Sequence, residues 1–248
     1  MQEFTKGIFL SLLRDMTLEE LKTKLKKINK MGFVAAHRTG NTGIGKTLED
    51  LLGIKENNIP LHDIAGVAEL KAYRKSAGSM LTLFTLEPQP PGGARDRFLL
   101  DNFGYSKRDN GRSKELHSTL SCKRYNNQGL KLSVEELKVR VVGKRRRLNI
   151  FWDVVSLEKK FLDKLPALVY VLADTKVTRG KEYFHYNEAY VLSGFDFDSF
   201  KKMVKKDWIA VDFRMFYKPN GQVRNHGTGF RVKINKLYDC FETKVKLL

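Results

Sequence analysis

Apolar residues recur at helical spacing close to the start of the chain. Thr17 and Glu20 have the spacing of a capping box, and apolar residues then follow every three or four positions until Gly32. These positions are Leu18, Leu21, Leu25 and Ile28. The pattern predicts an amphipathic helix that ends before Gly32.

Helix-like and strand-like segments then follow one another without strict alternation. Apolar runs typical of strands occur at 67–73, 79–85, 137–142, 148–152, 165–174, 208–217 and 227–234. Helices are predicted at about 44–52, 156–165 and 197–206. A further helix is predicted through Phe98 and Leu100, and a short helical piece is predicted at the C-terminus. This order predicts an α/β fold with a mixed central β-sheet flanked by helices.

Two segments interrupt the pattern. Residues 87–97, EPQPPGGARDR, have the prolines and glycines of a loop. Residues 105–135 are polar and basic, so we expect them to form an exposed excursion and not an element of the core. The basic turn GKRRR is expected to join residues 137–142 and 148–152 as a hairpin.

The composition favours a compact protein with a polyanionic partner. The chain has 248 residues, 42% of them hydrophobic, and its 46 Lys and Arg against 28 Asp and Glu give a formal net charge of +18. This apolar fraction is enough for a core, and the excess of positive charge favours nucleic acid as the partner. We expect one domain over 1–248, which can divide into lobes 1–165 and 166–248.

The sequence shows no sign of export or of a metal-binding cysteine motif. Cys122 and Cys240 lack the spacing of a zinc site or a disulfide framework. The apolar stretch GIFLSLL is too short for a signal peptide or a membrane span. We therefore expect a cytoplasmic protein without a membrane partner.

Residues 38–47, RTGNTGIGKT, match the phosphate-binding loop of ATP- and GTP-hydrolysing proteins. Gly40, Gly45, Lys46 and Thr47 satisfy the G-x-x-x-x-G-K-[ST] motif. Such a loop needs a buried apolar strand before it and a long helix after it. Here AAHRT precedes the loop and the predicted helix is short, although the apolar run ending at Asp174 resembles a strand that supplies a magnesium ligand. A P-loop NTPase is the alternative that this motif leaves open.

Asp63, Glu69 and Lys71 have the types and order of a metal-dependent nuclease site. On a strand, Glu69 and Lys71 emerge on one face, and the apolar residues between and beside them occupy the other. Phosphodiester hydrolysis needs a metal ion that activates water, and Mg²⁺ prefers oxygen ligands such as the carboxylates of Asp63 and Glu69 and the main-chain carbonyl of Leu70. Lys71 would position the water and offset negative charge. The other interpretation is a solvated strand face with an ion pair.

Several stretches together resemble one known family. They are RTGNTGIGKTLEDLLG, ENNIPLHD, AELKAYR, SMLTLFTLEP, VDFRMF and NHGTGFRV, within residues 37–88 and 209–234. In these stretches the chain resembles the MvaI/BcnI-type restriction endonucleases, which are related to the mismatch-repair nicking enzyme MutH. The resemblance implies a PD-(D/E)xK nuclease core with catalytic residues Asp63, Glu69 and Lys71, a supporting acid at Glu49, and Mg²⁺ held by Asp63, Glu69 and Leu70.

The resemblance also carries expectations about activity and partners. It implies a type II restriction enzyme that cuts double-stranded DNA at a CCNGG-like site, one strand at a time, as a monomer that needs no ATP, beside a cognate DNA methyltransferase. Residues 1–165 would then be the catalytic lobe and 166–248 the recognition lobe. Arg38 and Lys46 of the glycine-rich loop would contact the DNA. A MutH-like nicking enzyme and a DNA-binding protein without activity are the alternatives.

The last predicted strands carry side chains suited to G·C pairs. Asp212 and Arg214 share one face of residues 208–217, and Arg can bridge O6 and N7 of guanine while Asp accepts from N4 of cytosine. Arg231 and Lys233 alternate in the same way along 227–234, and His226 lies at the mouth of this hairpin. A cross-strand ion pair on a solvent face is the other interpretation.

Thr85 and the basic segments complete the candidate DNA contacts. At the position of Thr85, the chain resembles the branch of the family whose recognition sites have a central A·T pair. The segments KRDNGRSK and GKRRR are expected to contact phosphates without distinguishing bases.

Overall fold

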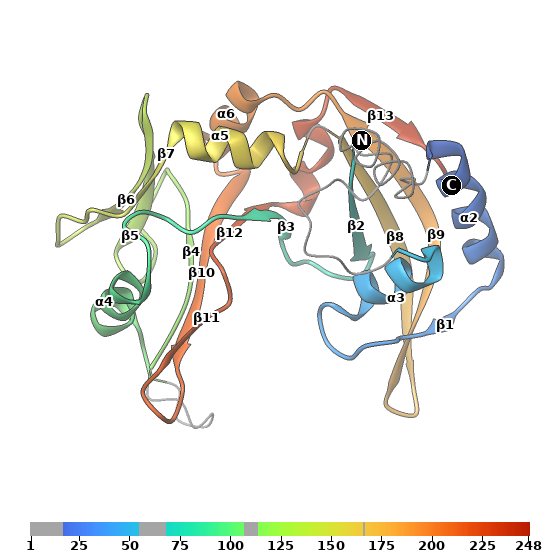
Figure 1. Ribbon diagram of the computed structural model, residues 1–248, viewed down its shortest axis with the longest axis horizontal. Helices are drawn as coiled ribbons and strands as arrows, with labels where there is room; N and C mark the ends of the chain where they lie inside the picture. Colours follow the sequence, from blue (N-terminus) through green and yellow to red (C-terminus); the bar gives the residue numbers. More distant parts are fainter. Residues whose placement is uncertain (1–16, 55–67, 107–113, 166) are drawn as a thin grey trace, which may run out of the picture. The chain divides into compact units, whose positions relative to one another are not determined.

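The computed structural model describes residues 17–54, 68–106, 114–165 and 167–248, and these form two compact units (Figure 1). The first unit takes its described residues from 1–78, 163–195 and 241–248. The second takes them from 79–162 and 196–240. Each unit thus combines segments that are distant in sequence, whereas the sequence analysis placed one boundary after residue 165.

The first unit is built on a mixed sheet. Its strands run in the order β1-β9-β8-β2, with β13 also paired to β9, and β2 is parallel to β8 whereas the other pairs are antiparallel. The elements are α2 (Leu18–Lys30), β1 (Val34–Ala35), α3 (Gly43–Leu52), β2 (Glu69–Arg74), β8 (Ala167–Thr178), β9 (Lys181–Ser193) and β13 (Thr243–Lys246). The mixed α/β fold predicted from the sequence is confirmed.

Two helices contribute to the core of this unit. The predicted capping box begins α2, because the Thr17 hydroxyl accepts from Glu20 N and the Glu20 carboxylate accepts from Thr17 N. The buried stripes of the helices are Leu21, Leu25 and Ile28 on α2, and Ile44, Leu48 and Leu52 on α3. α2 packs against β9 and α3, and α3 packs against β2. The α3–β2 contact brings the glycine-rich loop and the strand of Glu69 into one folded unit.

The second unit contains antiparallel sheets and the remaining helices. One sheet has the order β11-β10-β12-β3, with β4 also paired to β10, and another has the order β5-β6-β7. The strands are β3 (Leu81–Thr85), β4 (Glu115–Leu120), β5 (Leu130–Val134), β6 (Lys138–Gly143), β7 (Phe151–Asp153), β10 (Ile209–Tyr217), β11 (Val223–Asn225) and β12 (Gly229–Val232). The helices are α4 (Gly93–Phe103), α5 (Val154–Leu162), α6 (Phe197–Lys205) and the 3₁₀ turns η1 (Ile234–Lys236) and η2 (Tyr238–Cys240).

Alternation along β10 decides which face of its sheet is buried. Val211, Phe213 and Met215 are fully buried on one face. The residues between them therefore emerge on the opposite face, together with their partners on β4, β12 and β3. On the buried side, Phe230 of β12 stacks on Phe84 at 5.0 Å between ring centroids.

Three sequence predictions differ from the structure. Part of 105–135 belongs to the core, since β4 buries Leu116 and Leu120 and pairs with β10 along its length. The last predicted strand ends at Val232, so Lys233 lies beyond β12 as the residue before η1. The C-terminal piece ends in the strand β13, because its backbone pairs with β9. The first and third differences follow from long-range strand pairings that the local pattern does not report.

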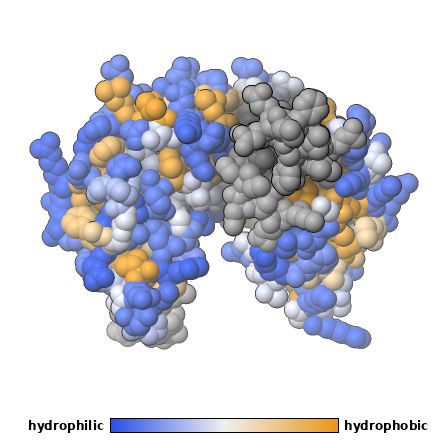
Figure 2. Space-filling model, in the orientation of Figure 1, coloured by the Kyte–Doolittle hydropathy of each residue, from blue (hydrophilic) through white to orange (hydrophobic). Residues whose placement is uncertain are grey.

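Hydrophilic side chains cover most of the molecular face that Figure 2 presents. This agrees with the 30% of charged residues in the chain. Across the described ranges, no helix combines the length and the apolar character that crossing a membrane requires.

Candidate functional site

The predicted Glu69 and Lys71 lie together on β2. They are two residues apart on one face of the strand, and Lys71 Nζ donates to Glu69 Oε1 at 2.6 Å. Glu69 is only 7% exposed, so this carboxylate belongs to the buried polar groups of the unit. The adjacent Leu70 packs its side chain into the core.

A second lysine, which the sequence analysis missed, holds the other oxygen of this carboxylate. Lys164 Nζ donates to Glu69 Oε2 at 3.1 Å. Lys164 precedes β8, and β8 pairs in parallel with β2 so that Leu168 lies opposite Glu69. The contact therefore depends on a strand pairing between distant segments. The one sign of it in the sequence is that a lysine precedes the apolar run 167–174.

The two lysines keep Glu69 ionised. Burial acts to raise the pKa of this carboxyl, but the charges and hydrogen bonds of Lys71 and Lys164 outweigh burial and hold the pKa below its ordinary value. An ionised carboxylate is the oxygen donor that a hard divalent cation prefers. Glu69 thus fits a metal ligand in its chemistry.

The other predicted metal ligand, Asp63, lies outside the described residues. Within the ranges described, no group of three or more His, Cys, Asp or Glu side chains has an arrangement suited to a metal ion. Of the three predicted metal ligands, the structure thus describes Glu69 and Leu70.

Glu49, the predicted supporting acid, lies on α3. It is half-buried and close enough to Tyr186 to affect its electrostatics. The pKa of Tyr186 is raised, chiefly by burial, and the charge of Glu49 adds to the effect. Tyr186 in turn donates its hydroxyl to Ile44 O at 2.7 Å. Glu49 thus lies on the helix that packs against β2, the strand of Glu69 and Lys71.

The glycine-rich segment does not have the arrangement of a phosphate-binding P-loop. Lys46 forms an ion pair with Asp50 one turn along α3, at 2.9 Å. Thr47 is fully buried, and its hydroxyl accepts from His37 N at 2.9 Å. The lysine of the motif thus pairs within α3, and the threonine bonds to the main chain that precedes the loop. The P-loop NTPase alternative therefore loses its structural basis.

The path of this segment is fixed by Arg74 of β2. Its guanidinium donates to Gly40 O at 3.0 Å and to Asn41 O at 3.3 Å, and it pairs with Glu182 on β9 at 2.7 Å. A Cβ on Gly43 would lie 2.2 Å from Arg38 O, so the turn requires glycine there. Arg38, predicted to contact DNA, is exposed on this segment.

In the second unit, four of the predicted DNA contacts, Thr85, Asp212, Arg214 and Arg231, lie on one side of the β10 sheet. We call this surface the polar face, defined by Thr85, His117, Thr119, Asp212, Arg214 and Arg231. Its centre is Gly229, where a Cβ would lie 3.6 Å from both Arg214 Nη2 and Arg231 Cγ. Two cationic side chains from neighbouring strands therefore converge on one point.

Asp212 and Arg231 form an ion pair within the polar face. The Asp212 carboxylate is buried, and it accepts from the guanidinium of Arg231, which also donates to Met80 O. Asp212 Oδ1, Arg214 Nε and Arg231 Nε are buried atoms that have no hydrogen-bond partner within the described structure. Such atoms cost free energy in the fold, and their gathering on one face indicates a surface shaped for a ligand.

The other predicted residues occupy different positions around this face. Thr85 is exposed at the end of β3, opposite Gly229. His226 is exposed in the segment after β11, and its ring lies 5.6 Å from that of Phe216. Lys233 is exposed just beyond β12, as the residue before η1.

Two exposed residues of the polar face were missed. His117 lies opposite Arg214 and Thr119 lies opposite Asp212 in the pairing of β4 with β10. Both belong to the segment that the sequence analysis expected to be an excursion. The alternation of Leu116, Ser118 and Leu120 with them was the signal that could have identified this strand.

Comparisons with known proteins identify the family and the fold of the chain. The family described as the MvaI/BcnI restriction endonuclease family matches residues 22–241. A solved structure of the restriction endonuclease MvaI with its cognate DNA substrate is similar, with a TM-score of 0.80 and 30% identity over 93% of this chain and 98% of that one. MvaI in the absence of DNA gives a TM-score of 0.51 and 27% identity over 92% and 96%. No curated protein sequence matches the chain.

Proposed function

The chain belongs to the MvaI/BcnI restriction endonuclease family and is a site-specific deoxyribonuclease, and from this premise we propose a finer function. It binds double-stranded DNA at a short CCNGG-like site and hydrolyses one strand at a time, as a monomer that uses Mg²⁺ and no ATP. A cognate DNA methyltransferase protects the same site in the cytoplasm of the host. The observation that carries the proposal is the Glu69 carboxylate, buried, ionised and held between Lys71 and Lys164.

Among the described residues, Glu69 is the side chain that would bind the metal ion. Its ionised carboxylate, the carboxylate of Asp63 and the main-chain carbonyl of Leu70 would hold Mg²⁺, and Glu49 supports the site from α3. When bound, the ion polarises the phosphate and lowers the pKa of a coordinated water. Lys71, on the same strand face as Glu69, orients the attacking water and offsets the negative charge that develops on the phosphate.

The polar face supplies base recognition. The guanidinium groups of Arg214 and Arg231 suit O6 and N7 of guanine, and the Asp212 carboxylate suits the N4 amino group of cytosine. The unpartnered buried atoms of these residues support this assignment, because a ligand that pairs with the polar face would relieve their cost. Thr85, at the edge of the polar face, and His226, beside that face, would contact the inner base pairs. Arg38, Lys46 and Lys233 would contact phosphates, which position the duplex.

Plasmid cleavage tests the proposed reaction. The protein is incubated with plasmid DNA with and without Mg²⁺, always without ATP, and the ends of the fragments are sequenced. We expect discrete fragments with one shared end sequence, and none in EDTA. Nicked circles without linear product would favour a MutH-like nicking enzyme, and DNA binding without any cleavage would contradict the proposal.

A matched pair of variants assigns the reaction to the site. Lys71→Ala is expected to abolish cleavage because Lys71 touches the reacting groups. Lys75→Ala removes another lysine just beyond β2, one that pairs with Glu188 at 3.1 Å, and is expected to retain cleavage. Equal activity of both variants would contradict the role of Lys71.

A further inference from the structure

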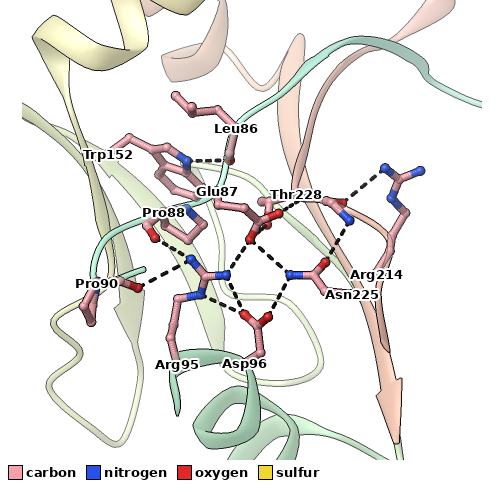
Figure 3. A network of polar contacts seen from close by, with 11 residues as sticks. Leu86, Glu87, Pro88, Pro90, Arg95, Asp96, Trp152, Arg214, Asn225 and Thr228 are labelled. Atoms are coloured by element: carbon pink, nitrogen blue, oxygen red, sulfur yellow. Dashed lines mark hydrogen bonds and ion pairs between the residues drawn. The ribbon is translucent and has the colours of Figure 1, made fainter. Parts of the chain in front are cut away.

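A buried arginine lies at the centre of a polar network in the second unit (Figure 3). The side chain of Arg95 is 2% exposed. Its guanidinium donates to Glu87 Oε2 at 2.5 Å, to Asp96 Oδ1 at 2.6 Å, and to Pro88 O. A buried guanidinium with this many acceptors is held in one orientation, and it fixes its carboxylate partners in turn.

The same carboxylates reach across to the segment between β11 and β12. Asn225 Nδ2 donates to Glu87 Oε2 at 3.1 Å and to Asp96 Oδ2 at 3.0 Å. Glu87 Oε1 accepts from Thr228 N at 2.7 Å. Residues 225–228 are therefore attached to the Arg95 network at both ends.

This attached segment presents two carbonyl groups to Arg214. Asn225 Oδ1 accepts from Gly227 N at 2.8 Å, and Gly227 has a φ of +86°, a conformation that favours glycine. In this turn, the carbonyl oxygens of Gly227 and His226 accept from Arg214 Nη2 at 3.2 and 3.4 Å. Figure 3 shows Arg214 at the end of the chain of contacts that starts at Arg95.

We propose that Arg95 and Asn225 are positioning residues for base discrimination, acting through the Gly227 and His226 carbonyls on the guanidinium of Arg214. The inference rests on the proposed role of Arg214 in recognising a G·C pair. A guanidinium reads guanine with two parallel hydrogen bonds, so its plane must be fixed before the DNA arrives. The two carbonyls hold Nη2. Asn225 anchors the segment that carries these carbonyls, and the buried Arg95 orients the carboxylates to which Asn225 donates.

The test uses Asn225→Ala, because this substitution releases one end of the segment and the bond to Gly227 N, while the bond of Thr228 N to Glu87 and the ion pairs of Arg95 with Glu87 and Asp96 remain. The cleavage site is first mapped with the wild-type enzyme, and kcat/KM is then measured on that site and on sites with one outer base pair exchanged. We expect Asn225→Ala to lower the preference for the mapped site by about 10-fold or more, within the range of one bidentate base contact. The thermal midpoint and kcat at saturating DNA are expected to change little.

A double-mutant cycle separates positioning from a merely structural role. In an Arg214→Ala background, Asn225→Ala is expected to cause no further loss of discrimination, because the residue it acts through is gone. A structural role would lower activity on every site equally and in both backgrounds, and that result overturns the inference. Asn102→Ala, which removes an α4 amide that bonds Phe98 O outside the network, is the control and is expected to retain discrimination.

The outcomes also separate this inference from the proposed function. A wild-type enzyme that cuts at no defined site would overturn both. If the wild type cuts a defined site and Arg214→Ala loses discrimination while Asn225→Ala keeps it, the inference alone is overturned. If Arg214→Ala keeps discrimination, base recognition by Arg214 is wrong and the inference fails with it.

Discussion

Lys164 Nζ lies 3.1 Å from Glu69 Oε2, although 95 positions separate these residues along the chain. The contact exists because β8 runs parallel to β2 in the central sheet, so the segment before β8 ends next to the first residue of β2. With Lys71 on the other oxygen, the carboxylate is flanked by two cations in a buried position. The charge state of the Glu69 carboxylate thus depends on residues from both segments.

We predict that Lys164→Ala shifts the acid limb of the pH–rate profile to higher pH. Removing one cation leaves burial opposed by Lys71 alone, so the pKa of Glu69 rises and the carboxylate is lost at a higher pH. The profile of kcat/KM against pH measures the shift. Lys159→Ala, which removes an exposed lysine of α5, serves as the control. An unchanged acid limb in Lys164→Ala would show that this lysine does not act on Glu69.

The same pKa shift predicts how stability depends on pH. Because the pKa of Glu69 is lowered in the folded protein, its ion pairs stabilise the fold fully above the ordinary value of 4.5. The contribution is lost as the pH falls from there through the lower folded pKa. Urea unfolding at a series of pH values is therefore expected to show a smaller acid destabilisation in Glu69→Gln than in the wild type. Parallel curves would contradict this prediction.

Alanine substitutions at two glycines of the 38–47 segment are predicted to change the free energy of unfolding in opposite directions. Gly43→Ala places a Cβ 2.2 Å from a backbone oxygen, so we expect a loss of about 1–3 kcal/mol in the free energy of unfolding. At Gly45 the nearest atom to a new Cβ is Glu49 Oε1 at 3.9 Å, so Gly45→Ala is expected to stabilise by about 0.4–1 kcal/mol. Chemical denaturation of the two variants measures both signs.

The Asp212–Arg231 pair is predicted to contribute to folding as well as to recognition. Asp212→Ala leaves the Arg231 guanidinium without its carboxylate in a partly buried position, at an expected cost of about 1–3 kcal/mol. Glu135→Ala breaks the more exposed pair with Arg140 and is expected to cost less than about 1 kcal/mol. If urea unfolding gives both variants the same stability, the pair is no more than a surface contact.

His117 is predicted to contribute to site preference. It is exposed on the polar face opposite Arg214, where an imidazole can reach a base edge or a phosphate. We expect His117→Ala to lower kcat/KM on the mapped site by about 5- to 10-fold, as for one lost hydrogen bond. Ser133→Ala on β5 removes a polar side chain from the other sheet of the unit and is expected to change kcat/KM little. The prediction is wrong if the two variants cut alike.

The sequence predicted the parts of the site that depend on neighbouring residues. Glu69 and Lys71 share a strand face because side chains alternate, and the pattern of β10 placed Asp212 beside Arg214 for the same reason. Local alternation does not report which strands pair. Lys164 and His117 were therefore missed, since each enters its cluster through a pairing with a distant strand.

The loop residues show a second limit of the sequence. The motif containing Lys46 and Thr47 matched a P-loop in its letters, but the partners of these side chains, Asp50 and the His37 backbone, decide what they do. Arg95 gave no signal in a segment dominated by proline and glycine. Its role depends on burial against Glu87 and Asn225, which only the folded unit brings together.

On the proposed assignment of base recognition to the polar face, the interleaving of the two units along the chain constrains how such an enzyme can change its target sequence. The unit with the polar face is assembled from 79–162 and 196–240, and the unit with Glu69 supplies the chain between and around them. A single genetic crossover therefore cannot transplant the polar face whole. A new specificity would have to arise by point changes on the existing strands, or by the coordinated exchange of both segments.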